Sequence, residues 1–194
     1  MTDLPPAKRW PGPAAATVAA LLVGLSACGD DPFAFDWIDT PDTALIYSLA
    51  RPELGLESGF SFVPPPTGAV IESPNATGTW DVALDTQAGQ MVLLPPGALG
   101  VTGRARVSVL GAVNFDEVVE APEDTLVYED DQPVPLASGT VYVVRTNRRP
   151  GSFGSSCVYY AKVEPVTIDV AGGTLLFRYV ASPVCNSREL TPPD

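Results

Sequence analysis

Three cysteines are the most reactive side chains of this 194-residue chain: Cys28, Cys157 and Cys185. A cysteine can form a disulfide, bind a metal or carry a lipid. The chain contains no histidine, which excludes Ser-His-Asp and Cys-His nucleophile systems and imidazole ligands for zinc or haem. We therefore predict no metal site and no cofactor, and we expect the cysteines to serve covalent attachment and cross-linking.

Arginine residues form a second group with binding chemistry. Arg145, Arg148 and Arg149 are the only cationic cluster, in a chain with 11 Lys+Arg against 23 Asp+Glu. On a loop, such guanidinium groups can bind a carboxylate, a phosphate or a sugar acid. The alternative is that they only neutralise the acidic protein. The same acidic balance repels phosphate backbones, so we expect no nucleic-acid partner.

Carboxylates are the remaining candidates for chemistry, and they gather in two places. One group is Asp124 with residues 129–131, and the other is Asp36, Asp39 and Asp42. Neither group has the alternating spacing and glycine of a calcium loop, so we interpret both as solvated acidic turns. Paired carboxylates can also hydrolyse glycosides when they flank the bond to be broken.

The first 27 residues have the pattern of an export signal. Lys8 and Arg9 precede residues 14–25, which are apolar apart from Thr17 and Gly24. This is a charged region followed by a hydrophobic region. As a helix, twelve residues extend about 18 Å, which is too short to cross a bilayer stably.

The segment that follows is Leu25-Ser26-Ala27-Cys28-Gly29, and it resembles the lipobox of bacterial lipoproteins. The resemblance implies cleavage before Cys28, a thioether-linked diacylglycerol on its sulfur, and acylation of the new amino terminus. Two or three acyl chains would hold the protein to a lipid bilayer permanently. The alternative is an ordinary secretory signal that happens to contain a cysteine. Removing residues 1–27 changes the net charge from −12 to −13.

The residue after the lipidated cysteine bears on localisation. An aspartate at that position retains many lipoproteins in the inner membrane, whereas this chain has Gly29, followed by Asp30 and Asp31. We therefore predict a bacterial cell-envelope protein, with the outer membrane favoured. Residues 28–40 form a short acidic tether with aromatic residues at 33, 35 and 37, which either pack on the domain or rest in the membrane interface.

Residues 41–194 are predicted to form a single β-rich domain. Short runs of β-branched and aromatic residues alternate with turn signals, and residues 114–120 are the only short helical candidate. Residues 79–84 and 90–94 flank Gln87-Ala88-Gly89 as a hairpin. Residues 104–110 alternate as a strand with one solvated face. The pattern predicts an all-β fold, an antiparallel β-sandwich or barrel of roughly eight to ten short strands.

A disulfide between Cys157 and Cys185 is predicted from hairpin register. If Gly172-Gly173 form a two-residue turn, paired residue numbers add up to 345, whereas the two cysteine numbers add up to 342. A bulge at Pro165, which cannot donate to a ladder, would absorb part of the difference. Export places these thiols in an oxidising compartment, where they are expected to pair.

A second resemblance lies in three carboxy-terminal segments. Residues 141–146, 160–163 and 176–179 resemble the last strands of HmuY-like haem-binding lipoproteins, which are also anchored all-β proteins. Family members that coordinate haem iron commonly use histidine, which this chain lacks, and Met91 is its only methionine besides the initiator. The resemblance supports the β-rich fold, and haem binding is not expected.

These features predict an anchored lipoprotein with a non-enzymatic binding, structural or interaction role, whose partner is an envelope protein or glycan. One alternative is an envelope hydrolase, which requires two acidic side chains in a cleft with a raised pKa. Another is a small-ligand or lipid carrier, which requires a deep apolar cavity.

Overall fold

A computed structural model describes residue 37, residues 40–151 and residues 154–192. The predicted signal peptide, the lipobox with Cys28, and most of the predicted tether lie outside these ranges. The chain divides into two units, residues 1–35 and residues 36–194, and all strands named below belong to the second. Within the described residues, no helix has the length and apolar character needed to span a bilayer.

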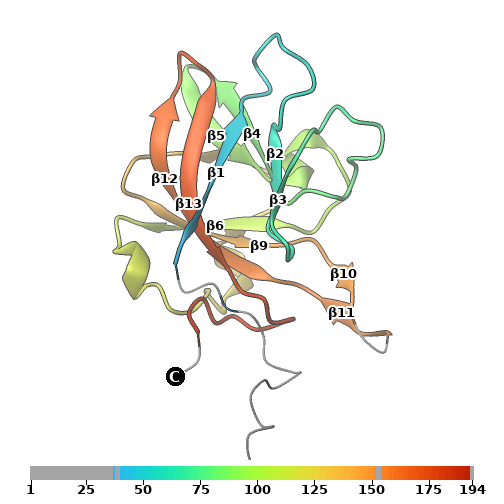
Figure 1. Ribbon diagram of the computed structural model, residues 1–194, viewed down its shortest axis with the longest axis vertical. Coiled ribbons are helices and arrows are strands. Elements are labelled where there is room, and N and C mark those ends of the chain that lie inside the picture. Colours follow the sequence, from blue (N-terminus) through green and yellow to red (C-terminus); the bar gives the residue numbers. More distant parts are fainter. Residues whose placement is uncertain (1–36, 38–39, 152–153, 193–194) are drawn as a thin grey trace, which may run out of the picture. The chain divides into compact units, whose positions relative to one another are not determined.

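The described chain forms an antiparallel β-sandwich (Figure 1). One sheet has the strand order β1-β13-β12-β9-β6-β7, the other has the order β3-β2-β4-β5-β8, and β10 pairs with β11 in a separate ribbon. The strands are β1 (Asp42–Tyr47), β2 (Gly59–Ser61), β3 (Thr67–Ala69), β4 (Val82–Gln87), β5 (Gln90–Leu94), β6 (Arg106–Gly111), β7 (Tyr128–Glu129), β8 (Val134–Pro135), β9 (Val141–Arg145), β10 (Arg149–Pro150), β11 (Ser156–Cys157), β12 (Tyr160–Asp169) and β13 (Thr174–Ala181). The predicted all-β fold is confirmed as a sandwich, and the sheets do not close into a barrel. The described residues form thirteen strands, more than the eight to ten predicted, and four of these strands are only two residues long.

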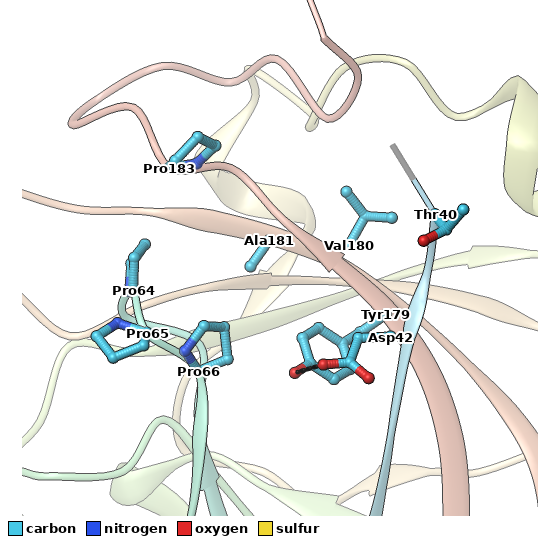
Figure 2. A pocket seen from close by; sticks show the side chains of 9 residues that line it. All are labelled: Thr40, Asp42, Pro64, Pro65, Pro66, Tyr179, Val180, Ala181 and Pro183. Carbon is cyan, nitrogen blue, oxygen red and sulfur yellow. Dashed lines mark hydrogen bonds between the residues drawn. The ribbon is translucent and has the colours of Figure 1, made fainter. Parts of the chain in front are cut away.

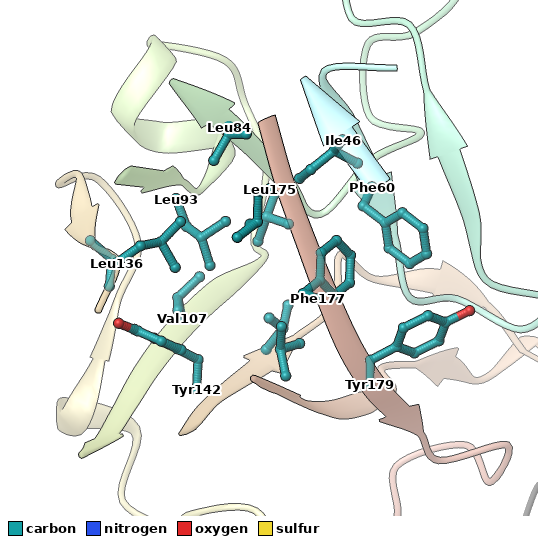
Figure 3. Packing of buried hydrophobic residues seen from close by; sticks show 14 of the residues in the cluster. Ile46, Phe60, Leu84, Leu93, Val107, Leu136, Tyr142, Leu175, Phe177 and Tyr179 are labelled. Carbon is teal, nitrogen blue, oxygen red and sulfur yellow. The ribbon is translucent and has the colours of Figure 1, made fainter. Parts of the chain in front are cut away.

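The core lies between the two large sheets, where alternate side chains of each strand point inward (Figure 3). Phe60 and Phe62 come from the five-stranded side, and Phe177 and Tyr179 come from β13. The ring centroids of these four residues are 4.8 to 6.2 Å apart, and every pair is in a tilted or edge arrangement. Such arrangements add stability beyond the burial of apolar area.

The outer face of the six-stranded sheet is covered over β6 and β9, contrary to the solvated face predicted for residues 104–110. Phe115, Val118 and Leu190 form a second apolar cluster over β9, and Ser108 of β6 is only 1% exposed. The predicted helix at 114–120 is wrong, because the segment contains only the short 3-10 helix η3 (Phe115–Glu117) before continuing in extended form. Contacts between distant segments decide this face, and strand alternation does not encode them.

Lys162 fastens this covering segment to the sheet. Its side chain is buried, and its Nζ donates hydrogen bonds to the carbonyl oxygens of Phe115 at 3.0 Å and Val118 at 2.9 Å. The ammonium also lies 4.7 Å from the centroid of the Phe115 ring. Burial lowers the pKa of Lys162, although the Asp116 carboxylate opposes the shift. Lys162 thus holds the segment that carries Phe115 and Val118 against the sheet.

The hairpin of β4 and β5 is confirmed. Gln87 pairs with Gln90, and Ala88 and Gly89 between them have φ values of +50° and +80°. Two consecutive residues with positive φ are typical of the turn that matches strand twist in two-residue hairpins.

The hairpin of β12 and β13 has a wider turn than predicted. Asp169 pairs with Thr174, so four residues separate the strands, and the two-residue turn is wrong. The Asp169 side chain accepts a hydrogen bond from the N–H of Gly172 at 2.8 Å, which stabilises the wider turn. The predicted bulge is confirmed, because the register shifts between Pro165 and Thr167.

Candidate ligand-binding sites

The three arginines predicted as an anion-binding loop are placed apart. Arg145 ends β9, and its Nε donates a hydrogen bond to the Tyr160 hydroxyl at 3.3 Å. Arg149 belongs to β10 and pairs with Cys157 across the ribbon. Arg148 is exposed between these strands and lines a hollow.

That hollow, which we call the arginine hollow, has a volume of about 520 Å³ and contains three arginines. It is lined by Gly78, Thr102, Gly103, Arg104, Arg106, Asn147 and Arg148. Sequence reasoning missed Arg104 and Arg106 as site residues. Their spacing of two was a usable signal, because it places both side chains on one face of an extended segment.

The charge in the hollow is not internally balanced. Arg104 and Arg148 are exposed and form no ion pair with any described residue. Arg106 uses one terminal nitrogen to bind Asp130 at 2.9 Å, while its buried Nε has no hydrogen-bond partner within the described part of the chain. Arg145 pairs with Arg106 in the β6–β9 register, so a further cation lies on the neighbouring strand.

Asn147 fixes the floor of the hollow. Its side-chain oxygen accepts the N–H groups of Arg104 at 2.6 Å and Ala105 at 3.0 Å. Its side-chain nitrogen donates to the carbonyl oxygen of Trp80 at 2.7 Å. The asparagine is 5% exposed. The buried side-chain amide of Asn147 therefore joins three segments: the residues just before β6, the loop that carries Trp80, and its own segment, which continues into Arg148.

Asp81 lies beneath this floor and is fully buried. Its two carboxylate oxygens accept the backbone N–H groups of Asn147 at 2.7 Å and Phe62 at 2.8 Å. Burial raises the pKa of Asp81 above its ordinary value, although these N–H donors and the Arg149 charge oppose the shift. Arg149 thus acts electrostatically on an internal carboxylate.

A second hollow, which we call the proline pocket, lies at the end of β13 and has a volume of about 440 Å³. Figure 2 shows Pro64, Pro65 and Pro66 on one side, with Tyr179 and Asp42 on the other. The Tyr179 hydroxyl donates to the Asp42 carboxylate at 3.2 Å. Burial, together with this carboxylate, raises the pKa of Tyr179 to about 12. The pocket is largely apolar with one polar edge.

The acidic residues that were candidates for chemistry do not converge on one site. Asp124 accepts the N–H of Leu126 at 2.9 Å and caps the 3-10 helix η4 (Thr125–Val127), while Asp130 binds Arg106. Asp36 and Asp39 lie outside the described residues. No group of three or more metal-ligating side chains occurs in the portion of the chain that the structure describes.

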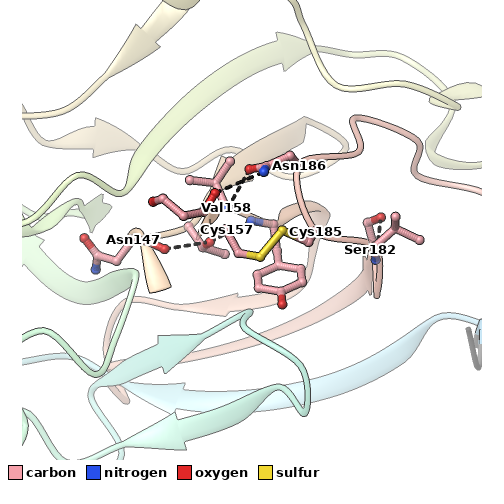
Figure 4. The surroundings of a disulfide bond; sticks show 10 residues. Asn147, Cys157, Val158, Ser182, Cys185 and Asn186 are labelled. Carbon is pink, nitrogen blue, oxygen red and sulfur yellow. Dashed lines mark hydrogen bonds between the residues drawn. A yellow bond between two sulfur atoms is a disulfide. The ribbon is translucent and has the colours of Figure 1, made fainter. Parts of the chain in front are cut away.

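The disulfide joins Cys157 of β11 to Cys185, which follows β13, with a Cα–Cα distance of 5.1 Å (Figure 4). Asn186 closes the same region, because its side-chain oxygen accepts the N–H of Val158 at 3.0 Å and its N–H donates to the Val158 carbonyl at 2.8 Å. The predicted disulfide is confirmed. The disulfide connects the β10–β11 ribbon, which carries Arg149, to the segment that follows β13.

No family model and no curated protein matches this sequence.

Proposed function

We propose that this chain is a bacterial envelope lipoprotein, anchored by acyl chains on Cys28, with a non-enzymatic binding role. The observation that carries the proposal is Leu25-Ser26-Ala27-Cys28 directly after the apolar stretch 14–25. Strand β1 begins at Asp42, the fourteenth residue after Cys28. Fourteen residues extend at most about 50 Å. The sandwich would therefore be presented close to the bilayer.

A binding role is supported by the two hollows. Pockets of several hundred Å³ with a few polar groups are typical of sites for small molecules. The hydrolase alternative stays a prediction. It requires two acidic side chains in a cleft, and the one described carboxyl group with a raised pKa, Asp81, is fully buried and has both oxygens engaged in hydrogen bonds.

Replacing Cys28 tests the anchor. In a bacterial host supplied with labelled palmitate, the wild-type chain is expected to incorporate label and to sediment with membranes. Cys28→Ser is expected to lose the label completely, because no sulfur remains to form the thioether. Ser26→Ala, which keeps a small residue before the cysteine, is the matched control and should retain the label. Full labelling of Cys28→Ser would contradict the proposal.

The same labelled material tests localisation. Density separation of the two membranes is expected to place the wild-type protein in the outer membrane of a host that has one. Gly29→Asp introduces the residue associated with retention and should move the protein to the inner membrane. An unchanged distribution for Gly29→Asp would contradict this part of the proposal.

A carrier of small apolar ligands is the second candidate, and the proline pocket favours it. Ala181 lines the pocket and also packs against the edge of the core, so Ala181→Phe should fill the space, and circular dichroism checks that the variant folds. If the pocket carries apolar ligands, a medium-chain fatty acid should bind the wild type and bind Ala181→Phe at least about tenfold more weakly. Calorimetry of both proteins measures this, and equal binding by both would contradict the carrier function.

A further inference from the structure

In the described part of the chain, Arg104 and Arg148 of the arginine hollow lack the acidic partners that three other arginines of the domain have. Arg145 and Arg149 also form no ion pair within the described residues, but they do not line the hollow. Arg51, Arg178 and Arg188 each form an ion pair with a glutamate, at 3.1, 2.6 and 2.7 Å. These are the pairings expected of arginines that only neutralise an acidic protein. Arg104 and Arg148 form no such pair within the described residues, in a chain where acidic groups outnumber basic ones by 23 to 11.

We propose that the arginine hollow binds a small molecule that carries at least two oxyanion groups, such as a sugar with carboxylates or phosphates. Guanidinium groups present planar pairs of donors that match a carboxylate or phosphate edge. Arg104 and Arg148 offer complete donor sets, so two separate oxyanion groups can be bound. This inference deepens the proposed binding role by naming a ligand class.

The hollow is fixed before any ligand arrives. Asn147 holds the backbone N–H groups of Arg104 and Ala105, and its own N–H is held by the buried Asp81. A rigid framework reduces the entropy lost on binding, because the backbones that carry the arginines do not have to be ordered first. The arginine side chains themselves are free to adjust to the ligand.

The size of the ligand follows from volume and charge. A hollow of about 520 Å³ lies within the range that accommodates drug-sized molecules. A long polyanion would extend beyond the hollow over a protein surface with excess negative charge, which would repel it. A small ligand, in contrast, interacts mainly with the local arginines, because salt screens charges that are more than about 8–10 Å away. The hollow therefore favours a small dianion over a polymer.

Calorimetric titration of the mature chain in neutral detergent tests the proposal with three probes. Pyrophosphate represents phosphate ligands, digalacturonate represents sugar acids, and a neutral disaccharide of similar size is the control probe. We expect at least one anionic probe to bind saturably, more weakly as salt increases, and the neutral disaccharide not to bind. The anionic probe that binds identifies the source of the oxyanions. Failure of both anionic probes to bind would overturn the proposal.

Three variants place the binding in the hollow. Arg104→Gln combined with Arg148→Gln should weaken binding by about tenfold or more, the effect of losing hydrogen bonds to a charged group. Thr102→Trp fills the hollow without changing its charge and should also weaken binding. Arg51→Gln is the control. Arg51 binds the Gly172 carbonyl in the turn between β12 and β13, so this variant removes one charge away from the hollow and should leave binding unchanged. Circular dichroism checks that each variant folds.

Two results would overturn the assignment. One is binding that survives either hollow variant, and the other is binding that Arg51→Gln weakens as much as the double variant, which would indicate a general charge effect. Palmitate labelling at Cys28 does not depend on the hollow. If no anionic probe binds in the calorimetric titration while Cys28 is still labelled, the proposed ligand class is rejected and the proposed anchor is not affected.

Discussion

Replacing Asp81 with alanine is expected to lower the free energy of unfolding by about 3–5 kcal/mol, because it leaves buried donors without an acceptor. The two backbone N–H groups of Phe62 and Asn147 lose their partner, and no solvent reaches a side chain that is 0% exposed. The total stability of a domain is about 5–15 kcal/mol, so the variant should be close to unfolding. Denaturant titration of the variant and the wild type measures the difference.

Ser61→Ala is the matched control for Asp81. The Ser61 hydroxyl donates to the same carboxylate at 3.4 Å, the longest of its three contacts. Its removal should cost no more than about 1 kcal/mol, the net value of an ordinary hydrogen bond. If Asp81→Ala lowers the free energy of unfolding by as little as Ser61→Ala does, the buried carboxylate is not needed to satisfy these backbone donors, and the prediction is contradicted.

The dependence of stability on pH gives an independent check on Asp81. Its pKa is raised in the folded protein, whereas an unfolded aspartate titrates near about 3.9. The folded chain then binds the extra proton, so the stability contribution of this group is present below about pH 4 and is lost as pH rises through the folded value. Asp81→Asn cannot titrate and should lack this component when the two stability profiles are compared.

Replacing both Cys157 and Cys185 with alanine is the second large effect that we expect. The chain-entropy model assigns about 3–4 kcal/mol to closing a loop of this length, and the two residues are 28 apart in sequence. Losing the cross-link increases the freedom of the unfolded chain, so the midpoint of thermal unfolding should fall. Calorimetry of the oxidised wild type and the double variant measures the shift.

Asn186→Ala is the control for the disulfide, because Asn186 holds Val158 and Ser156 in the same region without a covalent bond. It should destabilise the protein by less than the double cysteine variant. A thiol assay on the denatured, unreduced mature protein should find neither Cys157 nor Cys185 titratable. Two titratable thiols would contradict the disulfide.

The sequence predicted the disulfide because register is local arithmetic. Beyond the bulge at Pro165, paired residue numbers on β12 and β13 add up to 342, the same total as the two cysteine numbers. The predicted turn was wrong by two residues, because Thr174 pairs with Asp169 and not with residue 171. The Asp169 side chain stabilises this wider turn, which a pair of glycines does not predict. Proline at a bulge has a physical cause that can be inferred from the residue alone.

The arginine hollow could not be predicted in the same way. Arg104 and Arg148 are 44 positions apart in the sequence, and Asn147 brings their backbones together through a buried amide. Their closeness in the sequence suggested Arg145, Arg148 and Arg149 instead. These residues lie in different elements: Arg145 ends β9, Arg148 lies in the following loop, and Arg149 begins β10. Long-range hydrogen bonds determine which charges meet, and they leave no periodic pattern.

Mass spectrometry of the mature protein from its native membrane tests the proposed anchor most directly. We predict an amino-terminal peptide that begins at Cys28, lacks residues 1–27, and carries the added mass of a diacylglycerol thioether and an amide-linked acyl chain. A peptide that begins at another residue, or an unmodified Cys28, would contradict the account of this protein as an anchored lipoprotein.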